Sequence, residues 1–319
     1  MVFKFELVFN VRAAHLSGPY FLWRGPSMKK VLGIIGGSGL YNIDGLENEQ
    51  WVSVESAFGK PSDDVLIGEV EGQKVLFMTR QGREHNISPS KINYRANIDV
   101  MKRAGVTDLV SISACGSFRD HMAPCDFVIV DQFIDRTFAR EKTFFDESVV
   151  ARVSVAHPTC GGLSDLVMEA SKGISIKVHK GGTYLAMEGP QFSTLAESNL
   201  YHSWGCDVIG MTNMPEAKLA REAEICYCPV AMVTDYDSWH PEHGEVDVNE
   251  IRKTLGLNSG NARRLVKNLV PILKKNNDRH PCVQGCDHAL EYALLSDPAK
   301  IDPTVKSKIS AIAGRVLSK

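Results

Sequence analysis

The 319-residue sequence predicts an α/β fold, a single domain in which a central, twisted, mixed β-sheet is flanked by helices. Three observations lead to this prediction. Continuous apolar runs of strand length alternate with segments whose apolar residues recur every three or four positions. Several of the strand-like runs stop in glycine or small hydroxyl residues, as strands do before the ligand-binding loops of open α/β sheets. Hydrophobic residues make up 44% of the chain, which is enough for a sizeable core.

The first expected elements are strands. Residues 29–37, KKVLGIIGG, form a β-branched run that ends in glycines, which predicts a buried strand entering a tight loop. Residues 63–82 contain two apolar runs separated by Glu71 and Gly72. This pattern predicts two strands joined by a hairpin-like turn.

A helix is expected over residues 90–105, with Ser88 or Ser90 as its N-cap and Gly105 as its stop. The alternation of strands and helices then continues along the chain, by the same spacing of apolar residues. Further strands are expected over 106–117, 126–135, 182–190, 206–213 and 225–235, and further helices over 163–173, 194–205, 214–224 and 248–273.

Composition narrows the classes of function. The net charge is −2 and no basic block is present, so nucleic acid is not an expected partner. No stretch approaches the roughly 18 apolar residues of a membrane span, so no membrane association is expected. The eight cysteines are too sparse for a disulfide scaffold, and they predict free thiols in a reducing cytoplasm. A small molecule is the expected partner.

The last two cysteines of the sequence are candidate metal ligands. Cys282, Cys286 and His288 have the spacing C-x3-C-x-H, which could bind a metal ion. No second cysteine pair with such spacing is found elsewhere in the sequence. The sequence therefore predicts no metal.

Residues 1–27 are expected to be an extension, either disordered or the product of an upstream start, and the domain is expected over residues 28–319. The extension lacks the continuous apolar region of a secretory signal. It has few acidic residues and carries arginines, so a transit peptide is the alternative. Met28 opens the run MKKVLGIIGGSG, which is typical of a natural amino terminus.

Residues that suit an anion follow several of the predicted strands. Ser38 lies in the glycine loop GIIGGSG, and Arg80 follows the hairpin. Ser113 and Thr212 lie near the ends of two later strands. Each hydroxyl alone is more often a capping residue, but together with the arginine fork they predict a four-part anion site.

The glycine loop does not predict a dinucleotide cofactor. The dinucleotide fingerprint requires a glycine where this chain has Asn42. A loop that holds one phosphate fits the glycines and the serine better, so no cofactor is expected.

Asp235 and Asp237 stand one residue apart at the end of a predicted strand. On extended backbone their side chains would point the same way. In a closed pocket each carboxylate would raise the pKa of the other, and a carboxylic acid that stays protonated near neutral pH can act as a general acid. The alternative is a solvated strand end. The polar segment 238–247 that follows is long enough to act as a lid.

These motifs carry a resemblance to a known family. From about residue 29 to about residue 272 the chain resembles the purine nucleoside phosphorylase superfamily, and within it the 5′-methylthioadenosine phosphorylase branch. The matching segments are GIIGGSGL, FGKPSD, SPSKINYRANI, SACGS, VDQFIDRT, MEGPQFSTLAES, WGCDVIGMTNMPEAKLAREAEICY and TDYDSW. The resemblance implies reversible phosphorolysis of a nucleoside, with phosphate as co-substrate, in a homotrimer with shared sites.

The resemblance also implies roles for the residues at matching positions. Asp235 would share a proton with purine N7, and Asp237 would accept a hydrogen bond from the amine at C6. The implied phosphate-binding residues are Ser38, Arg80, Gln81, Ser113 and Thr212. The implied nucleoside-binding residues are Ala114, Met187, Phe192, Ser193, Met211, Val248, Ile251 and, from a neighbouring subunit, His157.

Some positions separate the branches of this family. In members that act on 6-oxopurines, the segment that resembles residues 192–194 reads Phe-Glu-Thr, whereas this chain has Ser193 in the middle position. Those members also have Asn where this chain has Asp235. Both differences favour adenine as the base. Val248 and Ile251 would suit a 5′-methylthio group, although their spacing also fits an ordinary helix core. Gln81 replaces a histidine, and Gln191 an arginine, that many relatives carry.

Three functions follow from the sequence. The first is 5′-methylthioadenosine phosphorolysis. The second is a phosphorylase or hydrolase that acts on adenosine, inosine or methylthioinosine. The third is a nucleotide-binding regulatory protein without turnover, and the complete set of Arg80, Asp235 and hydroxyl residues disfavours it.

Overall fold

A computed structural model describes residues 29–37, 39–146, 148–242, 246–277, 282 and 284–318. The expected extension over residues 1–27 and the candidate residue Ser38 lie outside these ranges. Within them, the strands form a single eleven-stranded sheet. The strands are β1 (Leu32–Gly36), β2 (Leu46–Val52), β3 (Val65–Val70), β4 (Gln73–Thr79), β5 (Asp108–Ser117), β6 (Phe127–Ile129), β7 (Gln132–Asp135), β8 (Val178–Lys180), β9 (Thr183–Ala186), β10 (Val208–Gly210) and β11 (Cys226–Asp235).

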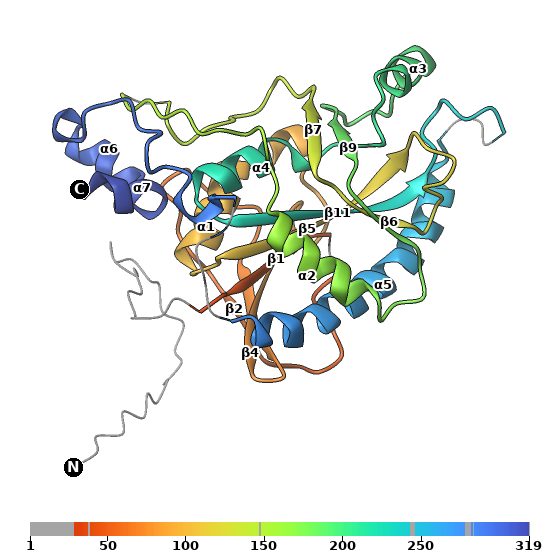
Figure 1. Cartoon of the computed structure of the whole chain (residues 1–319), viewed down its shortest axis with the longest axis horizontal. Helices are drawn as coiled ribbons and strands as arrows, with labels where there is room; N and C mark the ends of the chain where they lie inside the picture. The colour runs from red at the N-terminus through yellow and green to blue at the C-terminus, as the bar shows by residue number, and fades with distance from the viewer. Residues whose placement is uncertain are drawn as a thin grey trace.

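The sheet is mixed, as predicted. β1 lies between β4 and β5 and is parallel to both. β5 is parallel to β11 along most of its length and antiparallel to β10 near its end. β5 is therefore the strand through which the two halves of the sheet are joined (Figure 1).

Helices cover both faces of the sheet. α2 (Gly161–Ser171) and α5 (Val248–Lys275) pack together on one face, and α1 (Tyr94–Arg103), α4 (Asn213–Glu222) and α7 (Ser310–Leu317) pack on the other (Figure 1). α3 (Leu195–Ser203) projects beside β7 and β9. The short helix α6 (Pro303–Lys308) precedes α7, and the described 3-10 turns are η1 (Pro89–Lys91), η2 (Cys286–His288) and η3 (Pro298–Lys300).

The predicted hairpin is confirmed between β3 and β4. Glu71 has a φ of 51° and Gly72 a φ of 70°, so both central residues adopt the left-handed conformation that two-residue hairpin turns require. Glycine adopts it without strain, whereas Glu71 does so at some cost.

Several boundaries differ from the prediction. α1 is capped by Asn93, whose side chain accepts from the Ala96 N–H, so neither predicted serine is its cap. The expected strand over 126–135 is two strands, β6 and β7, which pair with different neighbours. The strand β2 was not predicted, because most of its residues are exposed and it has no apolar run.

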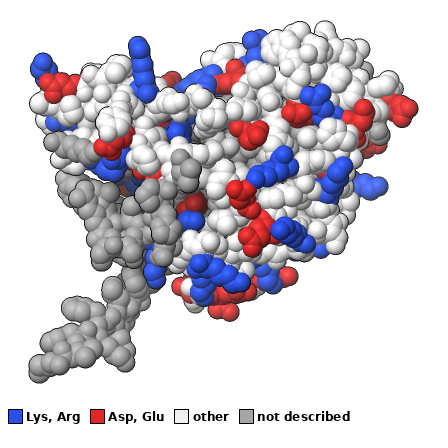
Figure 2. Space-filling model, in the orientation of Figure 1, with Lys and Arg blue, Asp and Glu red and all other residues white. Residues whose placement is uncertain are grey.

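The surface carries charged side chains of both signs. Figure 2 shows lysine and arginine side chains interspersed with aspartate and glutamate on the face that it presents. Among the described residues, no helix is both long enough and apolar enough to cross a membrane.

A buried carboxyl at the end of α4 fastens a long loop to the core. Glu222 accepts hydrogen bonds from the Phe144 N–H at 2.8 Å and from the Thr143 hydroxyl at 2.7 Å. Burial raises the pKa of Glu222 to about 7, against the hydrogen bonds that lower it. The folded state therefore binds this proton more tightly than the unfolded chain does.

This carboxyl predicts a pH dependence of stability. Its contribution is fully present below the unfolded pKa and is lost as the pH rises through about 7, so the free energy of unfolding should fall by up to about 3 kcal/mol between about pH 5 and about pH 8. Glu222→Gln should flatten this slope in urea denaturation, whereas Glu141→Gln, at an exposed position, should not. Equal slopes in all three proteins would contradict the assignment.

Candidate functional site

The carboxyl ends of β1 and β4 lie side by side, because Gly36 pairs with Thr79. The backbone N–H of Arg80 continues this pairing by donating to the Gly36 carbonyl at 2.9 Å. β5 pairs with β1 as far as Ser111 and then runs on. Ser113 therefore lies inside β5 rather than at its end, but it still lies beyond the edge where β1 stops.

Arg80 is buried and is held by the protein itself. Its Nε donates to Glu216 at 2.7 Å, its Nη2 donates to the Ser111 hydroxyl at 2.6 Å, and its Nη1 donates to the Ile112 carbonyl at 3.2 Å. Burial alone would lower the pKa of Arg80, but Glu216 outweighs burial and raises it. The described contacts leave one Nη1 hydrogen of this permanent cation for a ligand.

Polar side chains around this ion pair form a connected, buried network. The Asn213 amide donates to Ser111 at 3.1 Å and to Tyr227 at 2.9 Å, and the Ser113 hydroxyl donates to the Asn213 oxygen at 2.8 Å. Tyr227 and Ser111 both donate to Glu216. The network thus connects the charged pair to Ser113, one of the predicted anion-binding hydroxyls.

The other predicted anion-binding residues differ in their placement. Thr212 is the N-cap residue of α4, it is 8% exposed, and its side chain makes no capping hydrogen bond, so its hydroxyl remains for a ligand. Ala114 follows Ser113 on β5. The Gln81 amide instead donates to the Ile87 carbonyl at 3.0 Å, which holds it within its own loop.

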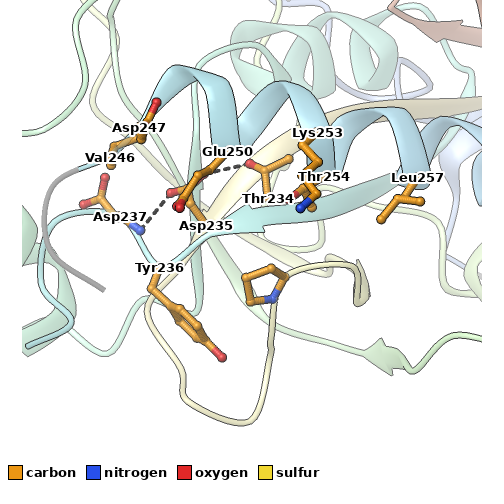
Figure 3. Close-up of a pocket in the computed structure, with 11 residues that line it drawn as sticks. Thr234, Asp235, Tyr236, Asp237, Val246, Asp247, Glu250, Lys253, Thr254 and Leu257 are labelled. Carbon is orange, nitrogen blue, oxygen red and sulfur yellow. Dashed lines mark hydrogen bonds between the residues drawn. The ribbon is translucent and has the colours of Figure 1, made fainter. Parts of the chain in front are cut away.

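The two aspartates line one cavity but do not lie on one extended strand. β11 ends at Asp235, and Asp237 has a φ of 52°, so the strand alternation expected for the pair does not apply. Asp235 accepts from the Thr234 hydroxyl at 2.7 Å and from the Asp237 N–H at 2.8 Å (Figure 3). The Asp237 carboxylate accepts from Ser198 of α3 at 2.5 Å.

The pKa values of both aspartates are raised, and burial is the main cause. For Asp235, burial outweighs the hydrogen bonds from Thr234 and Asp237, and the charge of Asp237 is the smallest contribution. For Asp237, burial outweighs the hydrogen bond from Ser198. The direction agrees with the prediction, but mutual repulsion is not the leading reason.

The aspartates face a cavity of about 250 Å³. Its walls come from the end of β11, residues 234–237, and from the N-terminal turns of α5 and the residues just before it, 246–257 (Figure 3). Val248 and Ile251 belong to these turns but are not among the lining residues. Val248 is 50% exposed, so the alternative of a helix-core position does not hold for it.

A glycine allows β5 to approach the carboxyl end of β11 closely. Gly116 pairs with Asp235, and a Cβ at Gly116 would lie 2.9 Å from the Asp235 Oδ1 and 3.3 Å from the Asp237 Cβ. Such a contact is too close for the carboxylate to keep its position. The missing side chain therefore sets where Asp235 sits.

One of the candidate base-binding residues, Ser193, contacts Asp237. The Ser193 hydroxyl lies 3.8 Å from the Met187 sulfur and also interacts with the Asp237 carboxyl. Phe192 is 44% exposed in the loop before α3, and Met211 is half-buried. His157 is exposed in the segment between β7 and α2.

A buried arginine that the sequence did not single out holds two of these segments together. The side chain of Arg140 is 1% exposed and pairs with Glu188 at 3.2 Å. Its Nη1 donates to the carbonyls of Met211 at 2.5 Å and Met214 at 2.6 Å, and its Nη2 donates to the carbonyl of Glu188 at 2.7 Å. Arg140 therefore fixes the spacing between the segments that carry Met187 and Met211.

Sequence reasoning also missed the buried partners of Arg80. Asn213 and Glu216 lie three residues apart, Asn213 just before the predicted helix over 214–224 and Glu216 within it, and both are buried. Two polar residues on an otherwise apolar face were the signal that could have identified them. No comparable signal marks Ser111, because it lies within a continuous buried run.

Comparisons with known proteins identify the family of the chain. The model of the phosphorylase superfamily matches residues 31–271. The S-methyl-5′-thioadenosine phosphorylase of Cereibacter sphaeroides is 63% identical over 290 residues, which cover 91% of this chain and 99% of that protein. The enzyme of the same name from Rhodospirillum rubrum is 56% identical over 288 residues, covering 90% and 97%.

Solved structures are similar as well. A methylthioadenosine phosphorylase from an Antarctic soil metagenomic library superposes with a TM-score of 0.84 at 41% identity, covering 89% of this chain and 99% of that one. A variant of the adenosine/methylthioadenosine phosphorylase of Schistosoma mansoni, solved with adenine, gives a TM-score of 0.77 at 30% identity, covering 84% and 99%.

The contacts of Arg140 predict a large effect on stability. Arg140→Met would leave Glu188 without its charged partner and several carbonyls without donors, so the free energy of unfolding should fall by about 3–5 kcal/mol in urea denaturation. Arg152→Met, at an exposed arginine, should change it by less than about 0.5 kcal/mol. Similar losses in the two variants would show that Arg140 does not hold these segments.

Proposed function

The chain belongs to the phosphorylase superfamily, in the S-methyl-5′-thioadenosine phosphorylase branch, and from this position we propose its reaction and the roles of its residues. The reaction is the reversible phosphorolysis of 5′-methylthioadenosine to adenine and 5-methylthioribose 1-phosphate. The observation that carries this proposal is Asp235, a half-buried carboxyl of raised pKa that lines a cavity and pairs with Gly116 of β5, the strand that bears Ser113.

The chemistry needs an acid on one side of the ribose and an anion on the other. The bond between C1′ and the purine nitrogen breaks with its electron pair moving onto the base, while a phosphate oxygen forms a bond to C1′. Asp235 gives its proton to N7 and neutralises the base as it leaves, and the phosphate dianion stabilises the positive charge on the ribose. The reverse reaction returns the proton to Asp235.

Phosphate binds beside the buried ion pair in this proposal. The free Nη1 hydrogen of Arg80 and the Thr212 hydroxyl supply donors, and the Ser113 hydroxyl supplies a third when it turns from the Asn213 oxygen to the phosphate, because all three residues border the same network. Ser38 and Gln81 complete the set, and Ala114 belongs to the nucleoside-binding residues, as the family resemblance implies. Phosphate is a co-substrate, and the proposed mechanism uses no further cofactor.

The base is read by Asp237 and its neighbours. Asp237 accepts a hydrogen bond from the amine at C6, and its left-handed backbone turns the carboxylate toward Ser193 and Ser198. Met187, Phe192 and Met211 form the apolar sides of the site. The 5′-methylthio group lies toward Val248 and Ile251, where an exposed valine offers apolar surface. Adenosine is the alternative substrate, since a related enzyme bears both names.

A homotrimer completes the proposal. Leu195 and Leu200 of α3 and Trp204 just after it are 45–61% exposed, and Phe192 precedes them. Such a group of exposed apolar side chains in one segment is typical of an interface between subunits. His157 would then reach the ribose of a neighbouring subunit. Light scattering that gave the mass of a single chain would contradict the trimer. All eight cysteines are described and unpaired, which supports the predicted location in the cytoplasm.

The first prediction concerns phosphate. Initial rates of base release should depend on phosphate for 5′-methylthioadenosine, adenosine and inosine, and should be highest for 5′-methylthioadenosine. Formation of one sugar 1-phosphate for each base released is the matching measurement. Release that continues unchanged without phosphate would identify a hydrolase instead.

The second prediction concerns the acid. Asp235→Asn should lower kcat/KM for 5′-methylthioadenosine by about 10²–10⁴-fold, because the proton for N7 is lost. Inosine, whose base carries an oxygen at C6, should lose less. In the unmodified enzyme the rate should decrease as the pH rises through the pKa of Asp235, and the variant should lack this decrease. Equal losses on both nucleosides would remove the proton role.

A further inference from the structure

Four cysteines that are far apart in the sequence meet in the structure. Cys160 precedes α2, Cys226 begins β11, and Cys282 and Cys286 lie in the segment after α5. Their sulfur atoms all lie within 4.8 Å of one another. The sequence pattern showed only the last two, so the second cysteine pair that a metal site needs exists in space rather than in sequence.

The sulfur positions suit a metal ion better than a disulfide. The sulfurs of Cys160 and Cys282 are 3.6 Å apart. Four sulfurs at about 2.3 Å from a tetrahedral zinc ion are separated by roughly 3.8 Å, whereas a disulfide requires about 2.05 Å. A tetrahedral set of four thiolates is typical of structural zinc.

The backbone around the cluster also suits thiolates. Cys160 occupies the N-cap position of α2, where the positive end of the helix dipole stabilises an anionic sulfur. Cys282 and Cys286 are separated by three residues, within the usual spacing of zinc-binding cysteine pairs. His288 is not a member of the group, since its Nδ1 lies 2.7 Å from Asp287 instead.

The cluster is shielded but can be reached. Cys160, Cys226 and Cys286 are at most 7% exposed, and they belong to the core beneath α2 and α5. Cys282 is only half-buried, which gives an ion a route from solvent. The guanidinium of Arg221 donates from Nη2 to the Gln284 carbonyl at 3.1 Å. Its positive charge therefore lies beside the loop that carries Cys282 and Cys286.

We propose that Cys160, Cys226, Cys282 and Cys286 bind one structural zinc ion. Each thiol gives up its proton to solvent on binding, so that four thiolates surround one divalent cation. The ion joins three separate parts of the chain: the start of α2, the start of β11 and the segment that leads to α6 and α7. Cys226 and Asp235 stand at opposite ends of β11, so the ion stabilises the fold and takes no part in the reaction.

Metal content tests this proposal independently of the enzyme activity. The full chain, produced with added zinc and purified with a reductant and without chelators, should contain one zinc per chain by elemental analysis. Cobalt substituted for zinc should give the thiolate charge-transfer bands and intense visible bands of a tetrahedral site. A chelator should lower the melting temperature of the unmodified protein.

Matched cysteine variants locate the ion. Cys282→Ser combined with Cys286→Ser should lose the zinc, the cobalt bands and the effect of the chelator. Cys228→Ser should keep all three, because this buried thiol lies two residues from Cys226 on the same strand but outside the cluster. If the reduced protein fails to take zinc from a chromophoric chelator, the proposal is overturned. Mass spectrometry showing these cysteines as disulfides in the freshly reduced-and-repurified protein would also overturn it.

Discussion

The ion pair between Arg80 and Glu216 is the constraint on which the site depends. Both groups are almost fully buried, and removing two charges from water is costly unless every hydrogen bond is made. Ser111 of β5 and Tyr227 of β11 bond directly to the pair, and Asn213 of α4 donates to both of them. The pair therefore sets the positions of the strand ends and of α4 before any ligand binds, as an anion site that must not reorganise requires.

Asp235, the proposed acid, owes its raised pKa to a different physical cause. Asp235 lies where β5 and β11 approach closely because Gly116 has no side chain, and burial there disfavours the charged carboxylate. Water and salt screen the effect of a nearby charge on a pKa, whereas the effect of burial on a pKa depends on packing alone. The protonation of Asp235 should therefore be insensitive to ionic strength and sensitive to anything that opens the cavity.

Sequence patterns predicted what depends on local burial and missed what depends on distant partners. The buried runs of β1, β5 and β11 were found, since continuous apolar residues mark strands covered on both faces. The edge strand β2 was missed because its side chains face solvent. Hydroxyls, arginine and aspartates near strand ends indicated the site. Three features could not be predicted from the sequence, because each depends on tertiary contacts. They are the backbone conformation of Asp237, the role of Arg140 and the meeting of four cysteines.

α3 has two different faces, and their combination has a thermodynamic consequence. Its inner face presents Ser198 to the Asp237 carboxylate, while its outer face carries the exposed Leu200, one of the side chains assigned to the proposed subunit interface. A nucleoside that orders the inner face would also order the outer one. By linkage, ligand occupancy and subunit association would then strengthen each other by the same factor. In that case the affinity of the site for the nucleoside would increase with protein concentration, because subunit association would favour the ordered form of α3.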